Sequence, residues 1–269
     1  MNLDFPTILV TATLVTGLIW ALDALLWAPA RKRKAAEQTD PERAAEVLKE
    51  PTLVEYAKSF FPVILAVLLL RSFLVEPFRI PSGSMMPTLL VGDFILVNKF
   101  AYGIRLPVAN TKVIDLGAPE RGDVVVFRFP KDPDIDYIKR VVGVPGDHLV
   151  YANKTLYING EQVPQIPIGD YVGIGSGLSM SGASMRREML GDAEHDILVV
   201  PGSHGINVDV VVPADQYFVM GDNRDNSNDS RYWGFVPDEN LVGRAFMIWM
   251  NWDSAASGVA WDRLGDSIQ

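Results

Sequence analysis

Two long apolar runs near the N-terminus constrain the fold of this chain more than any other feature. The first, FPTILVTATLVTGLIWALDALLW (5–27), contains a single charged residue, Asp23. A helix of ~20 apolar residues crosses the core of a bilayer, and Trp20 and Trp27 have rings that favour its interfaces. Because the preceding segment 1–4 has no Lys or Arg, the run is not typical of a cleaved signal peptide. We predict an uncleaved transmembrane helix over 5–27.

The second apolar run, SFFPVILAVLLLRSFLV (59–75), is shorter and contains Pro62. A buried core helix would have a similar composition. Lys58 and Arg71, however, lie near its two ends, where long basic side chains reach the headgroups of a bilayer. We predict a second transmembrane helix over 59–75.

The segment between the two runs, 28–58, is polar and holds seven Lys and Arg residues, four of them in RKRK at 31–34. Short loops rich in Lys and Arg stay in the cytoplasm. The sequence therefore predicts that 28–58 is a cytoplasmic loop and that segment 1–4 and the long C-terminal part face the other side. Asp23 lies near the cytoplasmic end of its helix, which favours an interfacial position over a functional charge within the membrane.

The charge of the chain is concentrated beyond these runs. Residues 1–75 carry eight basic and eight acidic side chains, so the net charge of −9 lies entirely in residues 76–269. An acidic domain argues against nucleic acid as a partner, because phosphate binding needs clustered Lys and Arg. The sequence has no Cys, which excludes disulfides, thiolate metal sites and a cysteine nucleophile.

From Glu76 onward the sequence consists of short runs separated by Gly, Pro, Asn and Asp, and several alternate apolar and polar residues as antiparallel strands do. The clearest runs are DFILVNKF (93–100), GDVVVFRF (122–129), YIKRVVGV (137–144), HLVYA (148–152), TLYING (155–160), QYFVMGD (216–222) and GRAFMIWMNW (243–252). We predict a mostly β fold, in which an antiparallel β-sheet domain formed by 76–160 and 213–252 follows the two transmembrane helices and precedes a C-terminal tail, 253–269.

Two features subdivide this domain. Asn159-Gly160 is a hairpin-turn dipeptide, so strands are expected to pair across it. Residues 161–212 are rich in Gly, Ser and Met, but LVV (198–200) and INVDVVV (206–212) are strand-like. We predict a smaller accessory β insertion with a mobile loop over 161–212.

Metal and histidine chemistry find little support in the sequence. His148, His195 and His204 lie in separate segments and form no HExxH-like pair, so we predict no metal site. Each lies in a turn-like or low-order setting that favours a surface position, and the chain has no GxSxG elbow. A Ser-His-Asp triad is disfavoured on these grounds, although its members need not be adjacent in sequence. No lysine has a serine three residues before it, which excludes an SxxK motif.

The segment PSGSMMPTLLVGD (81–93) is a candidate for a serine nucleophile, because a tight irregular turn can expose a hydroxyl while neighbouring amides point at an oxyanion. Taken alone, SGS is more typical of a linker. The base would have to be unprotonated near neutral pH, and a desolvated lysine meets that condition. Lys139 lies in the strand-like run YIKRVVGVPGD (137–147), where alternation places Ile138 and Arg140 on the opposite face. Taken alone, such a lysine is more often exposed to solvent.

A third segment, YFVMGDNRDNSNDSRYWGFVP (217–237), is dense in Gly, Asn and Asp. It is either a rigid polar turn or a loop that holds a buried base in place. In order and spacing, PSGSMMPTL, RGDVVVF, YIKRVVGVPGD and GDNRDNSNDSRYWGFVP resemble the boxes of bacterial type I signal peptidases, membrane-bound Ser/Lys proteases that remove signal peptides from exported proteins. The resemblance covers roughly 76–160 and 213–249. It leaves 161–212 largely unmatched, and some members carry a cysteine pair in that region which this chain lacks.

The resemblance implies a role for individual residues. Ser84 would be the nucleophile and Lys139 the general base, with Ser82 and the Ser84 amide in the oxyanion hole. Ser227 would orient the lysine amine. The residues supporting that arrangement would be Tyr137, Asp229 and Arg231. Shallow apolar pockets, suited to the small residues at signal-peptide cleavage sites, would be lined by Phe78, Ile80, Met85, Leu89 and Ile138.

The resemblance implies no cofactor. The partners it implies are the signal peptides of exported preproteins, membrane lipids and the protein-translocation machinery. It places the chain in the inner membrane of a bacterium, with the catalytic domain on the periplasmic side. Two alternatives stay open: a self-cleaving regulator of the repressor type, which has a similar dyad but lacks two membrane spans, and a membrane-bound scaffold or binding protein whose serines are structural.

Overall fold

The structure is a computed structural model that describes residues 5–106, 111–253 and 258–269. It divides into a helical unit, residues 1–74 with 105–110, and a β unit, residues 75–104 with 111–269. The expected N-terminal segment 1–4 lies outside the described residues, and so do residues 254–257 of the expected C-terminal tail.

Two helices in the helical unit are long and apolar enough to cross a membrane, Phe5–Ala36 and Thr52–Leu74. Its elements are α1 (Phe5–Leu22), the π-helical turn η1 (Asp23–Trp27), α2 (Ala28–Ala36), α3 (Pro41–Leu48), α4 (Thr52–Leu69) and the π-helical turn η2 (Leu70–Leu74). α1 packs on α4 through Trp20 and Phe61, whose ring centroids are 5.5 Å apart. Gly17 makes room for this contact, because a Cβ there would lie 2.7 Å from the Phe61 ring.

Both helices extend beyond the apolar runs that predicted them. The first continues through the RKRK sequence at 31–34, and the second begins at Thr52. Ala, Lys, Arg and Glu are strong helix formers, so the polar flanks continue the helices without contributing apolar residues. This continuation brings Arg31 to Asp23, whose two carboxylate oxygens accept hydrogen bonds of 2.6 and 2.7 Å from the guanidinium. Asp23 is therefore paired with a cation from its own helix.

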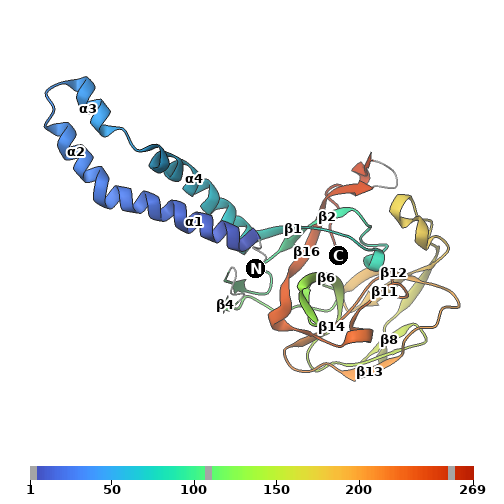
Figure 1. Cartoon of the computed structure of the whole chain (residues 1–269). Helices are drawn as coiled ribbons and strands as arrows, with labels where there is room; N and C mark the ends of the chain where they lie inside the picture. Colours follow the sequence, from blue (N-terminus) through green and yellow to red (C-terminus); the bar gives the residue numbers. More distant parts are fainter. Residues whose placement is uncertain (1–4, 107–110, 254–257) are drawn as a thin grey trace. The chain divides into compact units, whose positions relative to one another are not determined.

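Eight strands of the β unit form one antiparallel sheet. They are β1 (Val75–Arg79), β2 (Asp93–Asn98), β5 (Val124–Phe129), β6 (Asp132–Gly143), β14 (Gln216–Met220), β15 (Val236–Pro237), β16 (Leu241–Asp253) and β17 (Gly258–Val259). The order across the sheet is β1-β2-β16-β5-β6-β14-β15, with β17 paired to β16, and β16 can be followed beside β2 in Figure 1. Side chains of β2 are buried at alternate positions, whereas Val124–Phe127 of β5 are all buried, so both faces of the sheet are covered at its centre.

Smaller sheets flank this one. One contains β10 (Gln165–Asp170), β11 (Ser184–Leu190) and β12 (Ala193–Val199), and another contains β13 (Val208–Val211), β7 (His148–Ala152), β8 (Thr155–Ile158) and β9 (Glu161–Gln162). The remaining elements are β3 (Ile104–Arg105), β4 (Lys112–Ile114), α5 (Ser230–Trp233) and the 3-10 turns η3 (Gly83–Met85), η4 (Gly175–Met180), η5 (Asp238–Asn240) and η6 (Trp261–Arg263). Every predicted strand run contains a strand, which confirms the mostly β fold.

Asn159-Gly160 connects β8 to β9 as predicted. Both residues have positive φ, 54° and 86°, which the favoured two-residue hairpin turn requires, and Ile158 pairs with Glu161 across it.

The Gly-, Ser- and Met-rich part of the insertion 161–212 is more regular than expected of a loop. It forms β10 and β11, joined through η4. Its buried Met180 and partly buried Tyr171 pack in one cluster with Met86, close to the segment 81–93. The apolar contacts come from scattered Met and Tyr residues, which produce no clear sequence period.

Residues 258–269, expected as part of a tail, pack onto the main sheet. The Ile268 amide donates to the Phe246 carbonyl at 3.0 Å, and the Ile268 side chain joins the buried cluster that contains Met85 and Leu89. Arg263 donates to both carboxylate oxygens of Asp93 at the start of β2. The C-terminal segment therefore helps to hold the chain on either side of 81–93.

Candidate active site

Ser84 lies in a single 3-10 turn, η3, between strands β1 and β2. The Met86 amide donates to the Gly83 carbonyl at 3.2 Å, which closes the turn. Met85 is fully buried and anchors the turn in the core, while Ser84 retains 8% of its exposure. A tight turn pinned by a buried neighbour holds the serine hydroxyl in a fixed position.

Lys139 lies in β6, opposite Val125 of β5, and is 4% exposed. Its Nζ donates a hydrogen bond of 2.7 Å to Ser84 Oγ and one of 2.6 Å to the Ile138 carbonyl. Burial lowers the pKa of Lys139 to about 8, because desolvation penalises the ammonium more than the carboxylates of Asp229 and Asp222 favour it. A lysine with this pKa is partly neutral near physiological pH.

The segment 221–231 holds the serine turn from its other side. The Asn223 amide donates to the Ser84 carbonyl at 3.1 Å, and its side-chain amide donates to the Gly83 carbonyl at 2.9 Å. Only glycine fits at position 221 beside the turn, because a Cβ there would collide with the Ser84 carbonyl and the Ser227 side chain. Asn223 and Gly221 had no assigned role in the sequence-based prediction, since nothing in their local pattern distinguishes them from ordinary turn residues.

Asp229 and Arg231 form a buried ion pair inside this segment. Arg231 donates to the two Asp229 oxygens at 2.8 and 2.7 Å. Asp229 also caps α5, accepting from the Arg231 amide at 3.2 Å, and accepts from the Gly221 amide at 3.0 Å. One carboxylate thus joins the beginning and the end of the loop.

The remaining expected polar residues are close to the dyad but differ in their contacts. Ser82 Oγ donates to Ser84 Oγ at 3.4 Å. The Lys139 Nζ lies 5.5 Å from the centroid of the Tyr137 ring, which stacks on Phe129. Ser227 is buried beside Gly221, but within the described part of the chain its Oγ has no hydrogen-bond partner. The structure therefore places Ser227 near the serine turn without the expected hydrogen bond to the lysine amine.

The expected substrate-lining residues form one cluster under the turn. Phe78, partly buried, packs against buried members of that cluster, which include Ile80, Met85, Leu89 and Ile138. In this structure their side chains contact one another and form part of the core. Ile138 faces this cluster as alternation along β6 predicted, on the face opposite to Lys139.

A buried charged cluster beside the dyad contradicts one sequence-based expectation. His195 was expected at the surface, but it lies in β12 and is 5% exposed. Its Nε2 is 3.4 Å from Glu188 and 3.9 Å from Asp222, and burial together with nearby Arg140 lowers the pKa of the imidazole. The expectation was wrong because His195 faces Glu188 on the neighbouring strand and Asp222 of segment 221–231, and the second of these is remote in sequence.

Arg140 is fully buried and was assigned no role from the sequence. Its guanidinium donates to both oxygens of Asp222, at 2.8 and 2.7 Å, and to the backbone oxygen of Gln269 at 2.7 Å. Burial alone would raise the pKa of Asp222, but the pairing with Arg140 outweighs burial and keeps this pKa below its usual value. Thr88, four residues after Ser84, donates to Asp222 as well.

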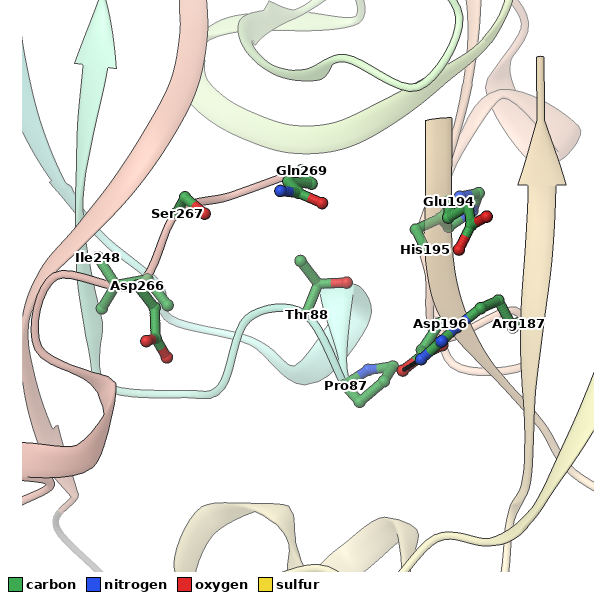
Figure 2. A pocket seen from close by; sticks show the side chains of 10 residues that line it. All are labelled: Pro87, Thr88, Arg187, Glu194, His195, Asp196, Ile248, Asp266, Ser267 and Gln269. Carbon is green, nitrogen blue, oxygen red and sulfur yellow. Dashed lines mark hydrogen bonds and ion pairs between the residues drawn. The ribbon is translucent and has the colours of Figure 1, made fainter. Parts of the chain in front are cut away.

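A pocket of about 480 Å³ opens next to this cluster. Figure 2 shows Thr88 and Pro87 on one side of it, Gln269 above, and His195 with Glu194 on the neighbouring strand. No three of the described His, Asp and Glu residues are grouped so that they could hold a metal ion. The sequence had no signal for this pocket, because residues from five separate segments line it.

Comparisons with known proteins match nearly the whole chain and not only the four motifs. The family described as signal peptidase, peptidase S26, matches residues 53–252. The chain is 52% identical over 271 residues to signal peptidase I of Pseudomonas aeruginosa, covering 94% of both proteins. It is 37% identical over 306 residues to signal peptidase I of Buchnera aphidicola from Schizaphis graminum, covering 96% of this chain and 97% of the relative. A crystal structure of a signal peptidase I from Enterococcus faecalis matches 48% of this chain and 98% of its own, with 26% identity and a TM-score of 0.29.

The family match spans both the second apolar helix and all strands of the main sheet except β17. The alignment with the Pseudomonas aeruginosa enzyme extends over nearly the full length of each chain, so it includes the insertion that the motifs left unmatched. From these matches we conclude that this chain belongs to the signal peptidase family, peptidase S26.

Proposed function

We propose that this chain is a membrane-bound serine endopeptidase that removes signal peptides from exported preproteins, with Ser84 as nucleophile and Lys139 as general base. The observation that carries the proposal is the 2.7 Å contact between Lys139 Nζ and Ser84 Oγ inside a buried site. Desolvation lowers the pKa of this lysine to about 8. Base and nucleophile are thus within direct proton-transfer distance, and the base is partly neutral at working pH.

The proposed reaction has two halves. Neutral Lys139 takes the hydroxyl proton as Ser84 Oγ attacks the scissile carbonyl, and the resulting ammonium gives that proton to the leaving amine as the C–N bond breaks. A water molecule then loses a proton to Lys139 and attacks the acyl-enzyme, which releases the new carboxylate and returns the proton to Ser84. The reaction needs no cofactor.

Ser82 and the Ser84 amide would stabilise the oxyanion that forms in each half. The 3.4 Å separation of the two serine hydroxyls supports this role, because one hydroxyl can then face the carbonyl oxygen while the other attacks its carbon. Ser227 would orient the lysine amine after a small rotation of its side chain, since it is buried beside the turn. Asp229, Arg231 and Tyr137 would hold these groups in place.

The substrate preference follows from the cluster under the turn. Phe78, Ile80, Met85, Leu89 and Ile138 pack closely, so any pocket that opens among them is shallow and apolar. Such pockets accept small side chains and reject large ones, which matches Ala-x-Ala-like cleavage sites.

The helical unit supports attachment to the inner membrane. Its two long helices carry apolar surfaces that remain largely exposed within the protein, as expected of surfaces that contact lipid. The basic run at 31–34 would keep the connection between them in the cytoplasm. The β unit would then act in the periplasm, where exported preproteins emerge from the translocation machinery.

Cleavage of a purified secretory preprotein in detergent or lipid, followed by sequencing of the new N-terminus, tests the proposal. We expect cleavage after a small residue by the wild-type chain, and loss of activity by at least about a thousandfold in Ser84→Ala and Lys139→Ala. Ser179→Ala and Lys131→Ala, both at exposed positions in the β unit, are matched controls and should retain wild-type rates. Substantial cleavage by either of the first two variants would contradict the assignment and favour a scaffold or binding protein.

A further inference from the structure

The accessory insertion, 161–212, is built into the loop that holds the serine turn. The Leu198 amide on β12 donates to the Asp222 carbonyl at 2.9 Å, and the Arg224 amide donates to the Leu198 carbonyl at 2.9 Å. Leu198 thereby forms an isolated parallel bridge with Asn223. The insertion and the loop are therefore joined by a pair of backbone hydrogen bonds. Neither sequence segment indicates that the other is its partner.

A buried two-pronged ion pair, called the Arg224–Glu188 fork below, strengthens this junction. Arg224 Nη1 donates to Glu188 Oε1 at 2.7 Å, and Nη2 donates to Oε2. The side chains are 1% and 0% exposed. Arg224 keeps the pKa of Glu188 low in spite of its burial. A planar guanidinium paired in this way fixes orientation as well as distance.

The fork connects to the dyad through three contacts. The Arg224 carbonyl accepts from Arg231 Nη2 at 2.6 Å. Arg231 is in turn held by both oxygens of Asp229. The carboxylates of Asp229 and Asp222 are the charged groups that act on Lys139, and they partly offset its desolvation. A displacement of the Arg224 backbone would therefore be passed through Arg231 to Asp229, a carboxylate that influences the base.

The backbone next to Arg224 connects to the nucleophile as well. Asn223 donates its two hydrogen bonds to Gly83 and Ser84 from the position immediately before Arg224. A movement at residue 224 therefore reaches the serine turn through one peptide unit and reaches Lys139 through Arg231 and Asp229.

We propose that Glu188 and Arg224 are positioning residues, whose fork lets the accessory insertion hold segment 221–231 so that Asp229 keeps its place relative to Lys139 and Asn223 stays on the serine turn. The proposal rests on the Ser84/Lys139 mechanism proposed above. It gives the insertion a part in setting the dyad, in addition to extending the fold.

Arg224→Lys is the variant that tests the proposal, because it keeps every formal charge and removes only the fork geometry. With the loop relaxed, Asp229 acts less on Lys139, so the base deprotonates more readily. We expect the acidic limb of kcat/KM against pH to move to lower pH by about half a unit. We also expect the plateau to fall about tenfold, because the serine turn is less well held.

Arg187→Lys is the matched control. Arg187 lies on β11 next to Glu188 and makes the same kind of fork with Asp196, drawn as a dashed contact in Figure 2. That fork lies at the surface and has no link to segment 221–231 among the described contacts. Arg187→Lys should therefore leave both the plateau and the limb unchanged. Should Arg224→Lys fail to fold, Glu188→Asp shortens the same fork from its other end and takes its place.

The outcomes separate this proposal from the one on which it rests. A fall in activity by the same factor at every pH, with an unmoved limb, would show that the fork only stabilises the fold and would overturn the proposal. An equal shift in Arg187→Lys would overturn it too. A wild-type profile without a rising limb, or an active Lys139→Ala variant, would instead contradict the Ser84/Lys139 mechanism itself.

Discussion

Replacing Lys139 by Met should make the protein inactive and, near neutral pH, more stable. Met has a similar length and carries no charge, so the variant removes the desolvation of the ammonium without leaving a large cavity. The free lysine pKa is 10.5 and the folded value is about 8. Well below pH 8 the lysine is protonated in both the folded and the unfolded state, and even at pH 7 most folded molecules carry the buried charge.

The size of this effect follows from proton linkage. Between pH 8 and 10.5 the unfolded chain binds more protons at this lysine than the folded chain does, so wild-type stability rises with pH over that window. The lysine costs about 3 kcal/mol of unfolding free energy at pH 7 and about 1 kcal/mol at pH 10. The stability advantage of Lys139→Met over wild type should therefore shrink by about 2 kcal/mol between pH 7 and pH 10.

Denaturant unfolding of the full chain in detergent, followed by tryptophan fluorescence at a series of pH values, measures this difference. Lys131→Met is the control, because Lys131 is exposed; its unfolding curves should run parallel to those of wild type. A Lys139→Met advantage that is the same at pH 7 and pH 10 would refute the reasoning, because it would mean that the lysine titrates alike in the folded and unfolded chain.

Three further substitutions test separate contacts. Gly221→Ala puts a methyl group against the Ser84 carbonyl and should lower kcat by about a hundredfold, as measured on a peptide substrate; an unchanged kcat would show that the loop can move aside freely. Asn223→Ala removes the hydrogen bond to Gly83 and should lower the unfolding free energy by about 1 kcal/mol, together with kcat/KM. Asp23→Leu leaves Arg31 without its carboxylate and should lower the melting temperature in detergent without changing cleavage of a soluble peptide. Adding Arg31→Leu to this variant should restore the melting temperature.

Local pattern was sufficient to predict most strands of the main sheet and one hairpin. Alternation identified β2 and β7 to within two residues, and Asn159-Gly160 identified a hairpin, because a strand period and a positive φ are properties of a few neighbouring residues. Helix ends were less predictable, since Lys, Arg and Glu continue a helix as readily as they form a polar loop. The first helix therefore extends to Ala36.

The site was predictable in its residue types but not in its geometry. Ser84 and Lys139 are each ordinary locally, and only the order and spacing of several segments indicated them. Their 2.7 Å contact depends on how η3 meets β6, which lie 55 residues apart. The position of Ser227 was equally unpredictable from the sequence, because its contact with Gly221 depends on how the loop folds.

The buried charges were the least predictable part. Arg140, His195 and Glu188 are spaced along strands like solvent-exposed polar residues, and each is buried by a segment remote in sequence. Arg140 meets the backbone of Gln269, and Glu188 meets Arg224. A charged side chain can be assigned to the interior only when its partner is known.

The most direct test of the central claim is the rate at which a β-lactam-type acylating agent modifies the full chain as a function of pH, with the modified residue located by mass spectrometry. Acylation uses the nucleophile and the base but no preprotein. We predict modification at Ser84, at a rate that rises with pH around a midpoint of about 8 and is lost in Lys139→Met. Modification of another residue, or a rate at Ser84 that is independent of both pH and Lys139, would contradict the account.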